Sequence, residues 1–369
     1  MTRPAGAPAF AHLDPTRVLD ALAAVDLEGD GRVLTLNSYE NRVFLAHLAP
    51  SSGAAAAVVA KFYRPGRWSD AQILEEHAFA LELAEAEVPV APPRRLQLAG
   101  AGSADGARSQ GCRALRAGSA AATTDHATLF ELDREGHVDR FSVSDRRAGR
   151  APEFDQPGVL RWVGRFIGRM HAVGARRRFE HRRTLGVESF GEDSLAALLE
   201  GHFVADEARG AWTDAARRAL DGVRACFERA GSVETIRLHG DCHVGNILWT
   251  DAGPHFVDLD DAVNGPAMQD LWMLLSGDRA ARTAQLADVI EGYETFRAFA
   301  PRELHLLEAL RTLRILHYSA WIARRWSDPA FPVAFPWFGT APYWSDQATR
   351  LREQIEAMDE PPLPVFGPT

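Results

Sequence analysis

Three polar side chains that could move a proton or hold a metal ion lie in the stretch 236–261, "IRLHGDCHVGNILWTDAGPHFVDLDD". They are Asp241 and Asn246 in "HGDCHVGN" and Asp258 in "VDLDD". Each lies near the end of an apolar run, where burying an unpaired carboxylate costs free energy. Packing gives no reason to keep two acids and an amide there, so the stretch indicates a site that handles charge.

The spacing of these residues suits phosphoryl transfer, in which a protein supplies positioning and charge neutralisation. Asp241 and Asn246 are separated by the four residues "CHVG", as are the catalytic aspartate and metal-binding asparagine of protein kinases. Asp258 takes the place of the second metal-binding aspartate, within "DLD" rather than "DFG". We expect Asp241 to orient the acceptor hydroxyl, and Asn246 and Asp258 to hold Mg²⁺. Asp258 is thus both a catalytic and a metal-binding candidate, and a metal role for Asp260 or Asp261 stays open.

A lysine and a loop near the N-terminus could contact the nucleotide. Lys61 ends the apolar run "AVVAK", as the phosphate-contacting lysine does in the V-A-I-K pattern. Its usual partner is a glutamate on the next helix, and we choose Glu76 over Glu75 because Glu76 shares the apolar face. No G-x-G-x-x-G precedes this strand. We expect Ser38, in "LNSYENRV", to offer a phosphate contact instead.

Hydrophobic patterning predicts the elements that must position these residues. Antiparallel strands are expected within 37–48 and 56–65, and two more within 127–145 about a Glu-Gly turn. One helix is expected after Ser69 as N-cap, and another ending at Gly174. Residues 99–128 contain mostly small and polar residues, so we expect a flexible insertion.

These elements predict an α+β fold with two lobes. The division expected is a β-rich nucleotide-binding lobe over 1–147, with the insertion at about 99–128, and a helical catalytic and acceptor-binding lobe over 148–369. The net charge of −9 argues against a nucleic-acid partner. No apolar run reaches membrane-spanning length, and the three cysteines form no metal-ligand spacing. We expect a cytoplasmic monomer.

Five segments in this order resemble the aminoglycoside phosphotransferase and choline kinase superfamily, and within it a bacterial Ser/Thr protein kinase: "NSYENRVF", "KFYRPGRW", "ILEEHAFAL", "HGDCHVGNILW" and "FVDLDDAVNGPAMQDLWMLL". The resemblance implies a two-lobed protein-kinase-like fold, ATP as cosubstrate, Mg²⁺ as cofactor, and phosphorylation of protein Ser or Thr in a stress response. It assigns the catalytic base to Asp241, metal ligands to Asn246 and Asp258, and an ATP contact to Ser38. It also implies that Asp270 braces the catalytic loop.

Two other functions fit the same residues. A kinase for a small hydroxyl compound, such as an amino alcohol, a sugar or an aminoglycoside-like acceptor, would share fold and cofactor. A non-catalytic nucleotide sensor is less compatible with the complete residue set. The segment 317–338, rich in aromatic residues and arginine, could belong to an acceptor surface, although core packing is favoured. No acidic cleft for a polycationic acceptor is visible in the sequence.

Overall fold

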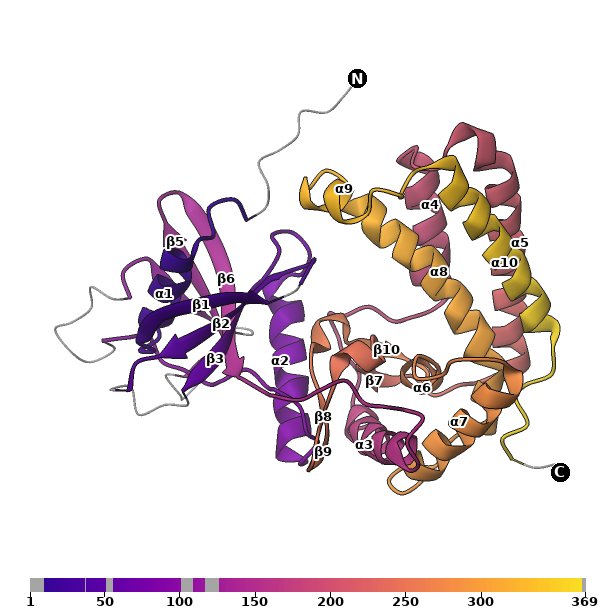
Figure 1. Cartoon of the computed structure of the whole chain (residues 1–369), viewed down its shortest axis with the longest axis horizontal. Coiled ribbons are helices and arrows are strands. Elements are labelled where there is room, and N and C mark those ends of the chain that lie inside the picture. The colour runs from indigo at the N-terminus through magenta and orange to yellow at the C-terminus, as the bar shows by residue number, and fades with distance from the viewer. Residues whose placement is uncertain (1–9, 37, 51–55, 101–108, 117–125, 367–369) are drawn as a thin grey trace. The chain divides into compact units, whose positions relative to one another are not determined.

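The computed structural model describes residues 10–36, 38–50, 56–100, 109–116 and 126–366. The chain divides into two compact units (Figure 1). The sheet unit contains Ala7–Gly149 together with His255–Asp260, and the helical unit contains Arg150–Pro254 together with Asp261–Thr369. The short segment 255–260, from the second half of the chain, therefore belongs to the sheet unit. A single division of the chain between residues 147 and 148 does not include this segment in the sheet unit.

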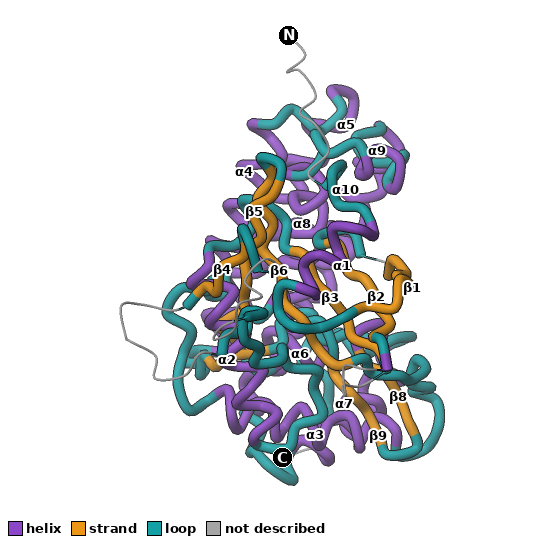
Figure 2. Tube along the Cα trace, turned by 90° about the vertical axis from the view of Figure 1, so that its left-hand side faces the viewer, coloured by secondary structure: helices purple, strands orange, loops and turns teal. Residues whose placement is uncertain are grey.

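The sheet unit is built on an antiparallel sheet with the strand order β1-β2-β3-β6-β5-β4, which can be followed strand by strand in Figure 2. The strands are β1 (Gly29–Leu36), β2 (Arg42–Leu48), β3 (Ala57–Phe62), β4 (Cys112–Leu115), β5 (Leu129–Arg134) and β6 (His137–Asp145). The predicted hairpins β2–β3 and β5–β6 are confirmed. The sheet buries a cluster of aromatic rings, among them Phe62 between Phe44 and Phe141 at centroid distances of 5.9 and 5.7 Å.

Helix α2 (Asp70–Glu85) follows β3 as predicted. Ser69 caps it, because its side chain accepts a hydrogen bond from the Gln72 amide while the Gln72 side chain accepts one from the Ser69 amide. The helix buries Glu76 on the same face as Phe79 and Leu83. The face assigned to Glu76 is therefore the buried one.

Helix α1 and strand β1 of the sheet unit were not predicted. Helix α1 (Pro15–Ala23) starts at Asp14, whose carboxylate accepts a hydrogen bond from the Arg17 amide, with proline in the first turn. Strand β1 pairs with β2 but leaves six of its eight residues exposed. Such a strand lacks the alternation of buried and exposed residues that would reveal it.

The expectation of a flexible insertion over the whole of 99–128 is wrong for residues 112–115. These form β4, which pairs with β5 from Cys112 opposite Leu132 to Leu115 opposite Leu129. An edge strand is held by its backbone ladder and needs little apolar surface of its own. Cys112 and Ala114 pack against the core of the sheet unit. Residues 101–108 and 117–125 of the expected insertion lie outside the described residues.

The helical unit is formed by α3 (Val159–Gly174), α4 (Asp193–Glu200), α5 (Asp206–Ala230), α6 (Met268–Trp272), α7 (Arg279–Tyr293), α8 (Leu307–Arg324), α9 (Ala330–Ala334) and α10 (Ala341–Asp359). Helix α3 ends at Gly174, as predicted. Short strands β7 (Ile236–Leu238) and β10 (Val263–Gly265) pair antiparallel, and β8 (Ile247–Thr250) pairs with β9 (Gly253–Phe256). None of the helices that the structure describes is long and apolar enough to cross a membrane.

Helices α3 and α7 approach closely because glycines line their contact. A Cβ added at Gly164 would collide with the carbonyl oxygen of Val289, and one at Gly168 with that of Tyr293. From the other helix, a Cβ at Gly292 would collide with the Arg161 carbonyl oxygen. The helices can pack backbone to backbone only while these positions carry no side chain.

We predict that Gly168→Ala lowers the free energy of unfolding by about 1–3 kcal/mol, because the added methyl group has to push the two backbones apart. Gly210→Ala is the matched control, since Gly210 lies within α5 and nothing lies within 4 Å of an added Cβ. The control should leave stability unchanged or raise it by about 0.5–1 kcal/mol. Urea unfolding measures both, and equal effects would contradict this account of the contact.

Candidate active site

The loop between β7 and β8 carries Asp241 and Asn246 and is folded back on itself. The Asn246 side-chain nitrogen donates a hydrogen bond to the backbone oxygen of Asp241 at 2.9 Å. The His243 amide donates to the same oxygen at 2.9 Å. The loop therefore brings Asp241 and Asn246 together, and the Asn246 amide oxygen is the atom that this arrangement leaves for a metal ion.

The side chain of Asp270, on α6, holds this loop in place by hydrogen bonds. Its side chain is fully buried, and its two oxygens accept hydrogen bonds from the amides of His239 and Gly240, each at 2.8 Å. His171 Nε2 lies 3.0 Å from Asp270 Oδ2, and His171 Nδ1 lies 3.1 Å from the Tyr293 hydroxyl. The expected bracing role of Asp270 is confirmed. His239 is buried within the loop, as a structural residue should be.

The carboxylate of Asp241 lies between two basic side chains. Arg314 Nη1 on α8 is 2.8 Å from Asp241 Oδ1, and His243 Nε2 is 3.5 Å from Oδ2. Burial raises the pKa of Asp241, but the hydrogen bond with His243 and the charge of Arg314 outweigh it and hold the pKa well below its ordinary value. Asp241 is therefore ionised at neutral pH. Arg314 has no place in the sequence motif and was not predicted.

Asp258 belongs to the sheet unit, to which the chain returns at His255, within β9. The Phe256 amide donates a hydrogen bond to the Pro89 carbonyl at 2.7 Å, and Phe256 forms a parallel bridge with Val90. Asp258 follows with φ of +61°, in the left-handed region that aspartate adopts more readily than most residues. An unusual backbone angle at a candidate metal ligand supports a functional constraint there.

Lys61 joins Asp258 inside the sheet unit. On β3 it pairs with Val43 of β2 on one side and Ser142 of β6 on the other. Its Nζ lies 3.2 Å from Asp258 Oδ1 and 3.0 Å from Asp260 Oδ1. Burial lowers the pKa of Lys61, but the carboxylates of Asp260 and Asp258 more than compensate and raise it well above its ordinary value. The amine is therefore a fixed positive charge.

Asp260 and Arg67 complete this cluster, and neither was in the predicted site. Asp260 is only 2% exposed, and Arg67 Nη1 binds its Oδ2 while Lys61 binds near Oδ1. Glu40 Oε2 lies 3.6 Å from Arg67 Nη1 on the other side. The two carboxylate oxygens of the buried Asp260 are thus paired with two cations. The Asp258 side chain, by contrast, is 56% exposed and accessible to a ligand. The sequence signals for this pair were "VDLDD", in which a metal role for Asp260 was left open, and the segment "KFYRPGRW".

The loop expected to contact phosphate, between β1 and β2, is hydrogen-bonded to the segment that contains Arg67. Ser38 lies in the connection between β1 and β2. Asn41 Oδ1 in this connection accepts a hydrogen bond from the Arg64 amide at 3.1 Å, and Arg64 Nε donates to the Glu40 carbonyl at 2.9 Å. Glu76 contributes to the raised pKa of Lys61, after Asp260, Asp258 and Tyr63. The nucleotide contacts of Ser38 and Glu76 stay predictions.

The donor atoms suit Mg²⁺ better than a softer metal. Within the described ranges, no group of three or more His, Cys, Asp or Glu residues is arranged to hold a metal ion. A lone amide oxygen from Asn246 and a carboxylate from Asp258 are hard oxygen ligands, which Mg²⁺ uses together with waters and substrate phosphates. Oxygen donors of this kind fit Mg²⁺.

We predict that Asp270→Asn lowers the free energy of unfolding of the helical unit by about 2–4 kcal/mol, because the amide turns a donor group toward buried donors. Asp288→Asn is the control, since the Asp288 side chain is 47% exposed and pairs with Arg161 at 3.2 Å. That change should stay within about 0.5 kcal/mol. Chemical denaturation followed by tryptophan fluorescence compares the two, and similar small effects would show that Asp270 does not hold the loop.

Comparison with known proteins places these features in a family. The sequence matches the phosphotransferase enzyme family over residues 33–307. It is 40% identical over 354 residues to stress response kinase A of Escherichia coli (strain K12), covering 96% of both chains. It is also 40% identical over 354 residues to the protein named serine/threonine protein kinase RdoA of Salmonella typhimurium (strain LT2), again covering 96% of both.

The fold agrees with a solved structure of lower sequence similarity. Amicoumacin kinase hAmiN, in complex with AMP-PNP, Ca²⁺ and Ami, superposes with a TM-score of 0.66 at 18% identity, covering 96% of each chain. The expected two-lobed kinase-like fold, with a β-rich N-terminal part and a mainly helical C-terminal part, is confirmed. The chain belongs to the phosphotransferase enzyme family.

Proposed function

We propose that this protein transfers the γ-phosphoryl group of ATP, with Mg²⁺, to Ser or Thr hydroxyls of proteins, as part of a bacterial stress response. The observation that carries the proposal is the 40% identity, over 96% of both chains, to a relative named as a serine/threonine protein kinase. The relatives named stress response kinase A support the physiological role. The candidate site supports the chemistry, because its base, cations and hard oxygen ligands are those that phosphoryl transfer needs.

Asp241 acts on the acceptor in this mechanism. Its ionised carboxylate accepts a hydrogen bond from the acceptor hydroxyl and aims the oxygen at the γ-phosphorus. The new bond joins the acceptor oxygen to the γ-phosphorus, the bond from that phosphorus to the β–γ bridging oxygen breaks, and ADP leaves. The hydroxyl proton passes to Asp241. Because the pKa of Asp241 is held low, this carboxylate orients the hydroxyl first and takes the proton late in the step.

The sheet unit holds the nucleotide in this proposal. Lys61 places its positive charge on the phosphates, and Ser38 adds a contact from the β1–β2 connection. Asn246 and Asp258 would hold Mg²⁺, which neutralises the phosphate oxygens when bound. Asp260 and Arg67 keep Lys61 and the Asp258 segment in place. The helical unit supplies the base and the acceptor surface, and we infer that the protein works as a cytoplasmic monomer.

We predict that Asp258→Ala abolishes Mg²⁺-dependent nucleotide binding, because the ion that bridges the phosphates loses a ligand. The control is Asp251→Ala, in the exposed turn between β8 and β9, which should bind as the parent does. Calorimetry with ATP in excess Mg²⁺ measures both. Parent-like affinity in Asp258→Ala would remove Asp258 from the metal site.

We predict that Asp241→Asn keeps near-normal ATP affinity while phosphoryl transfer falls by about two orders of magnitude or more. The amide occupies the same space but lacks the charge that aims the hydroxyl. Autophosphorylation or transfer to a protein acceptor measures the chemistry, and calorimetry measures binding. Unchanged transfer would remove Asp241 from the mechanism, whereas lost ATP binding would give it a structural or metal-binding role.

The acceptor class is tested in cell extract with γ-labelled ATP, the parent protein and Asp241→Asn as the inactive control. Label that enters protein bands as phosphoserine or phosphothreonine, only with the parent, supports a protein kinase. Label that stays with a low-molecular-weight acceptor would instead establish a small-molecule kinase. ATP binding with no label in either fraction would favour a nucleotide sensor.

A further inference from the structure

A line of side chains with alternating charge lies within the sheet unit and joins the motifs "NSYENRVF", "KFYRPGRW" and "FVDLDD". Two of its members, Glu40 and Arg64, are not among the residues that act in the proposed phosphoryl transfer. In the order in which they pair, the members of this charge line are Arg64, Glu40, Arg67, Asp260, Lys61 and Asp258. The charge line therefore runs from the connection between β1 and β2 to the candidate metal ligand.

The Glu40 carboxylate lies between two guanidinium groups. Its Oε1 is 3.2 Å from Arg64 Nε, and its Oε2 is 3.6 Å from Arg67 Nη1. All three side chains are no more than 10% exposed. Buried charges are screened much less than exposed ones, so these attractions are stronger than those of surface ion pairs. Loss of the Glu40 charge would leave two buried guanidinium groups without the carboxylate between them, which is unfavourable.

Arg67 links Glu40 to the acids at the other end of the charge line. Its Nη1, which faces Glu40, also binds Asp260 Oδ2. Lys61 Nζ lies 3.0 Å from Asp260 Oδ1 and 3.2 Å from Asp258 Oδ1. One nitrogen atom of Arg67 thus serves two carboxylates, so the position of Glu40 affects the contacts that hold Lys61.

Arg64 fixes the backbone of the connection between β1 and β2. Its Nη2 donates a hydrogen bond to the Tyr39 carbonyl at 3.1 Å, and its Nε donates to the Glu40 carbonyl at 2.9 Å. Its own amide donates to Asn41 Oδ1 at 3.1 Å. Backbone sites that bind anions present N–H groups and not carbonyl oxygens. Arg64 therefore engages two carbonyl oxygens beside Ser38 that would repel a phosphate if they faced it.

The Phe10 ring covers this end of the charge line. It is 7% exposed, and its centre lies 5.6 Å from the guanidinium carbon of Arg64 and 5.0 Å from that of Arg42. Arg42 Nη1 donates a further hydrogen bond to the Asn41 carbonyl at 3.3 Å. The face of an aromatic ring attracts a guanidinium group. Phe10 therefore helps to fix both arginines that hold the connection.

We propose that Glu40 is a positioning residue for the nucleotide, because its carboxylate couples the β1–β2 connection to Lys61 and Asp258. The phosphate contact expected from that connection, the lysine and the metal ligand are then held in one arrangement before the nucleotide binds. Such pre-organisation raises affinity, because less ordering is left to occur on binding. The inference rests on the proposed ATP- and Mg²⁺-dependent function and adds to it a residue that acts through its neighbours.

The test compares Glu40→Gln, which removes the charge at nearly constant shape, with Glu40→Asp, which keeps the charge on a shorter side chain. Calorimetry measures the affinity of the full chain for AMP-PNP in excess Mg²⁺. We expect Glu40→Gln to bind at least about tenfold more weakly than the parent. Glu40→Asp should recover part of this loss. At saturating ATP, phosphoryl transfer by Glu40→Gln should stay within about threefold of the parent, because the step at Asp241 does not involve Glu40.

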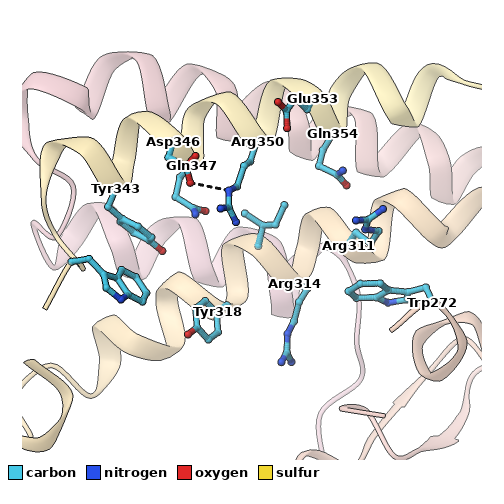
Figure 3. Close-up of a pocket in the computed structure, with 12 residues that line it drawn as sticks. Trp272, Arg311, Arg314, Tyr318, Tyr343, Asp346, Gln347, Arg350, Glu353 and Gln354 are labelled. Atoms are coloured by element: carbon cyan, nitrogen blue, oxygen red, sulfur yellow. Dashed lines mark ion pairs between the residues drawn. The ribbon is translucent and has the colours of Figure 1, made fainter. Parts of the chain in front are cut away.

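The matched control is Glu308→Gln, on α8 of the helical unit. Glu308 is likewise a partly buried carboxylate between two arginines, 2.5 Å from Arg282 Nη1 and 3.4 Å from Arg311 Nη1. Arg311 can be seen on α8 in Figure 3. Both substitutions should lower the melting temperature, but the control should bind AMP-PNP as the parent does. If Glu40 only stabilised the fold, the two variants would bind alike.

Hydrogen exchange of the protein without nucleotide tests the coupling itself. Glu40→Gln should speed amide exchange both at 38–41 and at 256–260, the segments at the two ends of the charge line. The Phe256 amide is a suitable reporter, because it donates a hydrogen bond to the Pro89 carbonyl at 2.7 Å. Faster exchange confined to 38–41 would show a local role and contradict the coupling.

Parent-like AMP-PNP affinity in Glu40→Gln would overturn the inference, as would an equal loss of affinity in Glu308→Gln. Failure of the proposed function gives a different result. If the parent binds Mg²⁺ and AMP-PNP but labels no protein, the proposed protein kinase function is wrong, while affinity still decides the role of Glu40. If the parent labels protein and Glu40→Gln binds nucleotide normally, this inference alone is wrong. A parent that binds no nucleotide would contradict both.

Discussion

Burying a carboxylate is costly unless donors or cations surround it, and the candidate site is organised around three acids that meet this requirement in different ways. Asp270 is fully buried and satisfied by two backbone amides and His171. Asp260 is buried between Lys61 and Arg67. Asp241 keeps its charge beside Arg314 and His243. The first two acids are neutralised by their partners within the fold, and the third keeps an ionised carboxylate.

The same requirement separates the roles of neighbouring acids in the sheet unit. Asp258 and Asp260 both pair with Lys61, at 3.2 and 3.0 Å. Asp260 is buried and paired with Arg67, so its charge is neutralised within the protein. Asp258 is half-exposed at a left-handed backbone position, so one side of its carboxylate stays available. One acid anchors the lysine, and the other can meet a metal ion.

The sequence could predict those parts of the fold and site whose information is local. The N-cap and buried face of α2, the β5–β6 hairpin and the spacing of Asp241 and Asn246 can all be read within short windows. Strand β4 could not be predicted, because it is held by hydrogen bonds to the backbone of β5 and not by a pattern in its own side chains. The Arg67–Asp260 pair joins residues 193 positions apart, and no local pattern shows such a partner. Arg314 was missed for the same reason.

The central proposal is that Asn246 and Asp258 hold one Mg²⁺ on the nucleotide. A double-mutant cycle on Mg²⁺·ATP affinity, with Asn246→Ala, Asp258→Ala and the double variant, tests it most directly. If both residues bind the same ion, removing the second ligand should cost little once the first is gone. We expect a coupling free energy of about 1 kcal/mol or more. Losses that add to within about 0.3 kcal/mol would contradict a shared ion.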